Sequence, residues 1–243
     1  MPVTIESVSA DEHIITISTA NGHNPKLYVR SGGSSDIKVF DQIFLEKEYQ
    51  PLVDLIQNQH PGKQVKYIID AGTNVGYTSV YLKSIFQEAA LVCIEPSSAN
   101  AKQIEKNFQL NNITNYQVIE AGLWSKNCWL TLKANDLNDA DWGFYVVESE
   151  AESDLKAVTL QSLLENNGWP VVDILKIDIE GSEKELFNDA EAIKSILSKT
   201  RFIAMEIHDQ VADRKKIYEV LKSAGFEWFE SGELTIASNI AFK

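Results

Sequence analysis

The chain has 243 residues, of which 44% are hydrophobic and 23% are charged, and its formal net charge is −13. This length suffices for one well-buried α/β core, and the negative charge disfavours nucleic acid and anionic membranes as partners, because clustered lysine and arginine bind phosphate. No apolar run approaches the roughly 20 residues of a membrane span, and the first residues lack the features of a signal peptide, so we expect a cytoplasmic protein.

Residues 1–60 are predicted to form an extension of the main domain and not an independent unit. Alternating apolar residues on either side of a turn-rich stretch predict a β-hairpin over residues 13–30. Apolar residues at helical spacing then predict two helices over residues 36–56. These helices either pack along an edge of the sheet or form a lid over a ligand, with Phe44 and Tyr49 as the candidate lid residues.

The main domain, residues 61–243, begins with the stretch that we expect to form the ligand site. An apolar run at 67–69 predicts a buried strand that ends at Asp70, and a helical pattern begins after Gly76. Gly72 and Gly76 remove side chains where the backbone turns tightly or approaches a ligand. A strand, a glycine turn and a helix present a small ligand at the carboxyl end of a parallel sheet. We therefore expect the Asp70 carboxylate to face the crevice.

The spacing of these glycines bears on which ligand the loop holds. A dinucleotide site uses G-x-G-x-x-G, whose middle glycine lets the pyrophosphate approach the helix N-terminus. Here the spacing is G-x-x-x-G, and Thr73 and Asn74 occupy the approach. A carboxylate just before the loop would also repel a diphosphate, whereas it suits a cationic ammonium such as that of S-adenosylmethionine (SAM). An ordinary turn without a ligand remains the alternative.

The second strand of the domain ends in another acid. Apolar residues 91–94 precede Glu95 and Pro96, which lie about 20 residues beyond the glycine loop, the spacing at which an acid binds ribose hydroxyls. The loop and this acid together indicate a ligand that contains adenosine, and NAD remains possible at this point. A third strand precedes Ala121 and Gly122, where the adenine is expected to lie and where glycine permits close approach.

The middle of the chain contains a further strand that is followed by acidic residues, which we expect at the same crevice. Two strand-like segments that flank a loop rich in Asn and Asp predict an inserted hairpin over residues 128–159. The fourth core strand, residues 172–177, is followed by Asp178 and Glu180. Lys176 lies within this apolar strand, and a buried ammonium needs a carboxylate partner.

The last third of the chain completes the predicted sheet. A fifth strand precedes Glu206 and His208, and two strand-like runs at 226–229 and 234–242 predict an antiparallel pair. A parallel sheet closed by a C-terminal reverse hairpin is the usual frame of SAM-dependent methyltransferases and not of dehydrogenases. We therefore predict a Rossmann-like class I methyltransferase fold, a mostly parallel seven-stranded sheet with a C-terminal antiparallel hairpin and helices on both faces.

At these motifs the sequence resembles the FkbM family of SAM-dependent methyltransferases. The most specific part is Leu-Lys-Ile-Asp-Ile-Glu-Gly-Ser-Glu at residues 175–183, and the resemblance runs from about Asp36 to the end of the chain. The other matching pieces are residues 70–76, Glu95 with Pro96, residues 158–160 and residues 205–208. The resemblance implies methyl transfer from SAM, mostly to a hydroxyl oxygen of a sugar, polyketide, peptide or other secondary metabolite.

The resemblance also implies roles for individual residues. The glycine loop would hold the methionine end of SAM, and Glu95 would bind the ribose hydroxyls. The expected cofactor-binding residues are Asp70, Gly72, Thr73, Asn74, Gly76, Tyr77, Thr78, Glu95, Pro96, Ser97, Ala121, Gly122, Asp178 and Glu180. The expected catalytic residues, which would face the methyl group and the acceptor, are Asp178, Glu206 and His208.

Methyl transfer is an in-line displacement on an activated sulfonium, so the enzyme chiefly aligns the reactants and excludes water. An alcohol acceptor must also lose its proton, for which His208 is the natural base by its pKa and Asp178 the second choice. Two alternatives stay open for His208. It either hydrogen-bonds to the backbone at the strand end, or it holds one divalent cation such as Mg²⁺ or Mn²⁺ together with Asp178 and Glu206. A carboxylate acceptor would need no base.

Three other functions remain as alternatives. One is methylation of a carboxylate or a nitrogen on a natural product. The second is an NAD-type oxidoreductase, which the missing G-x-G-x-x-G motif and the C-terminal hairpin disfavour. The third is a SAM-binding protein without catalytic activity, which is disfavoured because Asp70 and Glu95 are both present. For the preferred function the expected partner is a small-molecule methyl acceptor.

Overall fold

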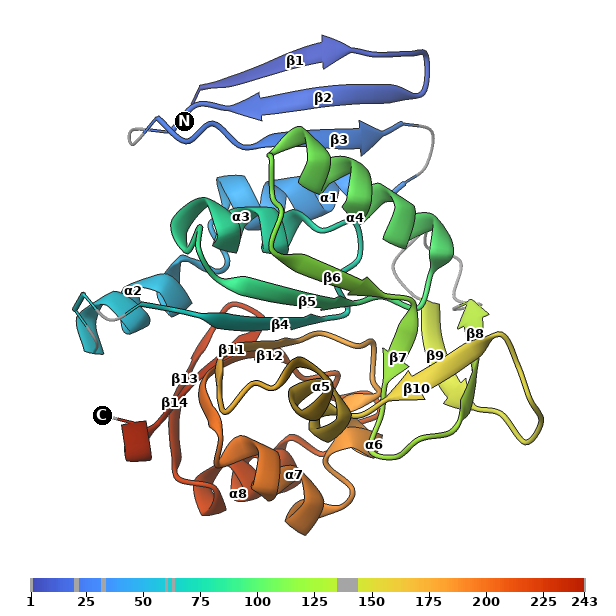
Figure 1. Cartoon of the computed structure of the whole chain (residues 1–243), viewed down its shortest axis with the longest axis vertical. Coiled ribbons are helices and arrows are strands. Elements are labelled where there is room, and N and C mark those ends of the chain that lie inside the picture. Colours follow the sequence, from blue (N-terminus) through green and yellow to red (C-terminus); the bar gives the residue numbers. More distant parts are fainter. Residues whose placement is uncertain are drawn as a thin grey trace.

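A seven-stranded mixed sheet forms the centre of the molecule (Figure 1). The computed structural model describes residues 2–19, 22–31, 34–59, 61–62, 64–134 and 144–242. The strand order is β13-β14-β12-β11-β4-β5-β6, in which β12, β11, β4, β5 and β6 are parallel and β14 is antiparallel to both β12 and β13. The strands are β4 (Tyr67–Ala71), β5 (Ala90–Ile94), β6 (Tyr116–Ile119), β11 (Val172–Ile177), β12 (Thr200–Glu206), β13 (Phe226–Ser231) and β14 (Leu234–Asn239). The predicted C-terminal antiparallel pair is therefore present at one edge.

Helices cover both faces of this sheet, which explains why its central strands are apolar throughout. On successive residues of β4 the side chains alternate between faces: Ile68 joins the hydrophobic core on the side of α3 and α4, and Ile69 joins the core on the side of α5, α7 and α8. The helices are α3 (Tyr77–Ile85), α4 (Ser98–Leu110), α5 (Leu160–Asn167), α6 (Glu183–Leu186), α7 (Ala190–Leu197) and α8 (Arg214–Ser223). A short 3₁₀ turn, η2 (Ile240–Phe242), follows the last strand. No helix in the described part of the chain is both long and apolar enough to cross a membrane.

A three-stranded antiparallel sheet precedes the main domain and lies over α4 (Figure 1). The predicted hairpin is confirmed as β2 (Glu12–Ile17) and β3 (Lys26–Arg30), and β1 (Val3–Ser7), which was not predicted, pairs with β2. Four of the five residues of β1 are exposed, so it shows only a weak apolar signal. The side chain of Asn107 on α4 accepts a hydrogen bond from the Tyr28 N–H at 2.7 Å and joins this sheet to the main domain.

The helical segment that follows packs into the core of the main domain. It consists of α1 (Asp36–Phe40), the π-helical turn η1 (Asp41–Leu45) and α2 (Gln50–Gln59), so both predicted helices are present, with the first continuing into a π turn. Asp36 is fully buried and pairs with the Arg30 guanidinium at 2.7 Å. Phe44 stacks on Phe40 and meets the edge of Tyr81, which makes it a core residue.

The predicted inserted hairpin is confirmed as β8 (Trp129–Ala134) paired with β9 (Phe144–Glu148), and the loop between them lies outside the described residues. The hairpin is part of a four-stranded sheet in the order β7-β10-β8-β9, which includes β7 (Ala121–Leu123) and β10 (Leu155–Val158). Trp124, Leu130, Val146 and Ala157 form a small separate core beneath it. Trp124 is thus a packing residue of this sheet.

Candidate active site

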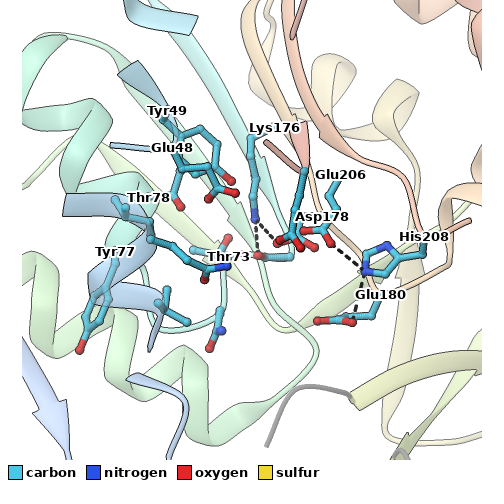
Figure 2. A pocket seen from close by; sticks show the side chains of 16 residues that line it. Glu48, Tyr49, Thr73, Tyr77, Thr78, Lys176, Asp178, Glu180, Glu206 and His208 are labelled. Carbon is cyan, nitrogen blue, oxygen red and sulfur yellow. Dashed lines mark hydrogen bonds and ion pairs between the residues drawn. The ribbon is translucent and has the colours of Figure 1, made fainter. Parts of the chain in front are cut away.

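A cavity of about 350 Å³ lies at the carboxyl ends of β4, β11 and β12, beside the glycine loop (Figure 2). Its volume lies within the range of small-molecule sites, about 300–1,000 Å³. The residues that line it are Val39, Gln42, Ile43, Glu48, Tyr49, Gly72, Thr73, Asn74, Tyr77, Thr78, Lys176, Asp178, Glu180, Glu206, His208 and Glu233. Nine of the predicted site residues are in this set: Gly72, Thr73, Asn74, Tyr77, Thr78, Asp178, Glu180, Glu206 and His208.

The glycine loop is held between two strand ends. The N–H groups of Gly72 and Thr73 both donate to the Ile94 carbonyl at the end of β5, at 3.0 and 3.1 Å. Gly72 has φ +74°, and a Cβ on it would lie 1.6 Å from the Asp178 carbonyl oxygen. A side chain at this position would therefore collide with the end of β11. Close approach of two strands, and not of a ligand alone, requires this glycine.

Asp70 does not face the cavity, and the prediction that it would is wrong. Its carboxylate is fully buried, accepts a hydrogen bond from the Ser79 hydroxyl at 2.6 Å and lies 3.4 Å from the Lys176 ammonium. Lys176 is the register partner of Asp70 on the adjacent parallel strand, which brings the two side chains together. Lys176 also donates to the Gly72 carbonyl at 2.6 Å and lies 3.5 Å from Asp178 (Figure 2). The predicted carboxylate partner of Lys176 is thus confirmed.

Glu95 lies behind the glycine loop at the end of β5 and is 5% exposed. Its carboxylate accepts hydrogen bonds from the N–H groups of Asn74 at 2.8 Å and Ser97 at 3.0 Å. Burial raises the pKa of Glu95 to about 7, although these hydrogen bonds act in the opposite direction. Each carboxylate oxygen has two lone pairs, so ribose hydroxyls can still donate to it, and ribose binding remains a prediction.

Several other predicted cofactor residues have local structural roles. Ser97 is the N-cap of α4, and its hydroxyl accepts from the Asn100 N–H. Pro96 precedes this cap, and Gly76 is the left-handed residue that begins α3. Tyr77 turns its hydroxyl toward the N-terminal sheet, where it donates to the Tyr28 carbonyl at 2.5 Å. Of Gly76, Tyr77, Pro96 and Ser97, Tyr77 lines the cavity.

Ala121 and Gly122 are buried residues of β7 in the four-stranded sheet, and they are not among the described residues that line the cavity. A Cβ on Gly122 would lie 2.5 Å from a methyl group of Leu130 on β8. The glycine makes room for Leu130, and close approach of the adenine at this position stays a prediction. The sequence gives no local sign of this, because Leu130 reaches Gly122 only through the four-stranded sheet.

His208 follows β12 and stands among carboxylates (Figure 2). Its Nδ1 lies 3.3 Å from Glu183, and its Nε2 lies 3.5 Å from Glu180 and 3.6 Å from Glu206. Burial by itself lowers the pKa of His208, but the hydrogen bonds to Glu180 and Glu183 and the charges of Glu183 and Glu206 outweigh it and raise the pKa to about 11. The imidazole is therefore protonated at neutral pH and does not accept a proton in this state. This charge argues against His208 as the base, and that role stays a prediction.

The cavity wall carries an excess of negative charge. Among the residues that line it, five are acids, namely Glu48, Asp178, Glu180, Glu206 and Glu233, and two are basic, namely Lys176 and His208. Burial and the charges of Asp178 and Glu233 raise the pKa of Glu48 to about 7, and burial and the charge of Asp178 raise that of Glu206 to about 8. Such a wall favours a ligand with positive charge.

Glu48 and Glu233 were not predicted from the sequence as site residues. Glu48 precedes α2 in the N-terminal extension, and Glu233 lies in the turn between β13 and β14. Neither belongs to a motif, and the fold brings both to the cavity from regions far apart in the chain. Tyr49, one of the two proposed lid residues, also lines the cavity, whereas Phe44 is buried in the core.

A glycine turn after the first strand, acids after the two neighbouring strands and an antiparallel pair at the sheet edge define a methyltransferase-like α/β fold. The family model described as the methyltransferase FkbM domain matches residues 70–228, which is more than half of the chain. The chain belongs to this family.

Its relatives carry methyltransferase names. The chain is 23% identical over 203 residues to "Methyltransferase 1" of Beauveria bassiana (strain ARSEF 2860), with 75% of this chain and 80% of the relative covered. It is 22% identical over 192 residues to "Methyltransferase sdnD" of Sordaria araneosa, with 66% and 73% covered. The crystal structure of methyltransferase FkbM from Methylobacillus flagellatus KT superposes with a TM-score of 0.50 at 13% identity, over 71% of this chain. This chain spans 43% of the length of that protein, and the similarity shows a shared fold.

Proposed function

We propose that the protein is a SAM-dependent methyltransferase that methylates a hydroxyl group of a small molecule. The observation that carries this proposal is the excess of carboxylates around a cavity that borders the glycine loop. SAM bears a positive sulfonium and a positive ammonium, and the carboxylate walls suit both charges. Membership of a methyltransferase family supports the same conclusion.

We propose that the described residues contact the cofactor in two places. The loop residues Gly72, Thr73 and Asn74 line the cavity and are proposed to hold the methionine end. Glu95 is proposed to accept hydrogen bonds from the ribose hydroxyls. Asp70 contributes indirectly: together with Lys176 it fixes the loop from behind, because Lys176 bonds to the Gly72 carbonyl.

SAM supplies an activated methyl group, so the work of the chain is alignment, exclusion of water and removal of one proton. Val39, Ile43 and Tyr49 form an apolar wall from the N-terminal extension, which we propose keeps water from the reacting atoms. Because His208 carries a proton, the acceptor's hydroxyl proton is assigned to a carboxylate, either Asp178 or the ionised form of Glu206, whose pKa is raised to about 8. Both side chains line the cavity and can accept a hydrogen bond.

The cavity volume is that of a small-molecule site, which supports a small acceptor. The excess of carboxylates also suits an acceptor amine, and N-methylation is therefore the second candidate function. Oxygen is preferred because the family is expected to act mostly on hydroxyl groups.

Calorimetry with SAM and with NAD tests the cofactor. We expect saturable binding of SAM, none of NAD, and at least tenfold weaker SAM binding by Glu95→Ala, since each lost hydrogen bond to a charged group is worth about 1.5–3 kcal/mol. Glu191→Ala is the matched control, because the Glu191 side chain on α7 is 87% exposed. Binding of NAD in place of SAM would refute the proposal.

Transfer of a labelled methyl group to panels of alcohols, amines and carboxylic acids tests the acceptor. The proposal predicts turnover with alcohols. Turnover confined to amines would establish the second candidate, and SAM binding without transfer to any panel would support a non-catalytic SAM-binding protein.

A further inference from the structure

Three side chains at the ends of β11 and β12 are arranged as a metal site would require. One ligand atom from each of Asp178, Glu180 and His208 can be chosen so that all three atoms lie within 4.8 Å of one another. Two ligands on opposite sides of a Mg²⁺ or Mn²⁺ ion are about 4.2 Å apart, given metal–oxygen distances near 2.1 Å. Of three ligands only one pair can be opposite, and adjacent ligands of an octahedral ion are about 3.0 Å apart, so side-chain movements of up to about 2 Å would bring the three atoms to ligand distances. All three side chains are partly exposed to the cavity, which leaves positions for a further ligand.

A buried carboxylate orients the imidazole within this cluster. Glu183 is fully buried, and one of its oxygens accepts a hydrogen bond from the Ile179 N–H at 3.1 Å and lies 3.3 Å from Nδ1 of His208. Because a carboxylate only accepts, Nδ1 is the donor, and Nε2 is the nitrogen that faces Glu180 and Glu206. Histidines that bind metals are held in this way, with the second ring nitrogen bonded to a carboxylate or carbonyl.

A second observation concerns Glu183 itself. Its other carboxylate oxygen is buried and has no hydrogen-bond partner among the described residues. A buried anion in this condition is costly unless positive charge lies nearby. A dication bound to Nε2 of His208 would make Nδ1–H a stronger hydrogen-bond donor to Glu183. Its positive charge would also offset the negative charge of the buried Glu183 carboxylate.

We propose that Asp178, Glu180 and His208 bind one divalent cation, with Glu206 beside it, and that this cation binds the acceptor oxygen of the methyl transfer. The set differs from the one expected from sequence, because Glu180 joins Asp178 and His208 as a ligand and Glu206 stands next to them. Two carboxylates and one imidazole suit Mn²⁺, since carboxylates favour Mg²⁺ or Mn²⁺ and imidazole favours the transition metals. The role of the cation in methyl transfer rests on the proposed function, whereas the existence of the cation site does not.

The site would complete the chemistry of the transfer. The acceptor oxygen forms a bond to the methyl carbon while the carbon–sulfur bond breaks, and the electron pair of that bond moves to sulfur, which becomes a neutral thioether. The hydroxyl proton goes to the Glu206 carboxylate, which the positive charge of the neighbouring cation keeps ionised. A cation on the acceptor oxygen makes that proton easier to remove, as metal ions do for bound water. His208 then acts as a ligand and needs no role as a base; the cation would displace the proton from its Nε2, because a ligating imidazole is neutral.

Binding of Mn²⁺ to the metal-stripped full chain, measured by calorimetry and by electron paramagnetic resonance, tests the site. We expect one saturable site, and at least tenfold weaker binding by Asp178→Asn, Glu180→Gln and His208→Gln. Glu183→Gln should also weaken binding about tenfold, as loss of a carboxylate behind a histidine ligand does. Glu233→Gln is the matched control, an acid of the same cavity outside the cluster, and it should stay within threefold of the wild type.

The spectrum provides a readout that does not depend on affinity. Coupling of the imidazole nitrogen to bound Mn²⁺ should appear in the wild type and vanish in His208→Gln, while circular dichroism confirms that each variant is folded. Absence of saturable Mn²⁺ binding, or equal losses in Glu233→Gln and the three ligand variants, would overturn the inference. SAM binding by the metal-stripped chain is measured in parallel, because SAM binding without a Mn²⁺ site would refute the site and leave the proposed function standing.

Discussion

Replacement of Lys176 by methionine tests the charge arrangement that joins the glycine loop to the sheet. Lys176 is 3% exposed. Its ammonium forms ion pairs with Asp70 and Asp178 and donates a hydrogen bond to the Gly72 carbonyl. Methionine has a similar length and fits an apolar strand, so the change removes the charge and little volume. It leaves the fully buried Asp70 with the Ser79 hydroxyl as its remaining partner among the described residues.

Removal of one member of a buried ion pair costs about 3–5 kcal/mol, because the other charge is left uncompensated. For a chain of this size each kcal/mol lowers Tm by about 2–4 °C, so Lys176→Met should lower Tm by roughly 6–20 °C. The double variant Asp70→Asn, Lys176→Met has no buried charge at this point. It should therefore recover about half of the loss or more.

Urea unfolding followed by circular dichroism measures both free energies. The midpoint concentrations should shift while the slopes stay equal, which keeps the comparison within two-state behaviour. A loss below about 1 kcal/mol for Lys176→Met would show that the pair contributes no more than a surface ion pair does. A double variant as unstable as the sum of the single variants would show that the two charges are not coupled.

Two further changes test the loop and the acid behind it. Gly72→Ala should destabilise the fold by about 1–3 kcal/mol more than Gly168→Ala, because both glycines have positive φ but only the Cβ at Gly72 meets a backbone oxygen, that of Asp178; equal losses in urea unfolding would contradict this. Protonation of Glu95, whose pKa is raised to about 7, competes with ribose hydroxyls that donate to it. SAM affinity should therefore fall about tenfold or more from pH 8 to pH 6, and calorimetry on Glu95→Gln should show a clearly smaller fall, which comes from Glu48 and Glu206, whose pKa values are raised to about 7 and about 8. The same raised pKa means that protonated Glu95 contributes stability that is fully present below about pH 4.5 and is lost as the pH rises through about 7. A SAM affinity of the wild type that is flat between pH 6 and pH 8 would rule out ionised Glu95 as the ribose ligand.

The elements of the fold could be predicted from the sequence where burial dictates residue type. The strands β4, β5 and β11 are covered on both faces, so they appear as short continuous apolar runs. The need of Lys176 for an acid was also predictable, since an ammonium in such a run cannot remain unpaired. β1 was missed because it is an exposed edge strand whose pattern depends on its partner and not on a core.

The identity of the cavity residues was predictable where they follow a strand directly. Asp178 and His208 follow parallel strands whose carboxyl ends meet, Glu206 is the last residue of one of these strands, and the structure brings all three to one cavity. Glu48 and Glu233 come from an extension and a hairpin turn, and no local pattern marks them. Their place in the site depends on contacts between segments that are distant in the chain.

The sequence by itself thus determined the order of the strands in the central sheet, the glycine turn and the family, because these follow from local periodicity and short motifs. The tertiary structure decided the direction and charge of the side chains. Asp70 turns inward because Lys176 is its register partner on the adjacent strand, and His208 holds a proton because Glu180, Glu183 and Glu206 surround it. Electrostatic interactions depend on distance in space, and only the fold sets those distances.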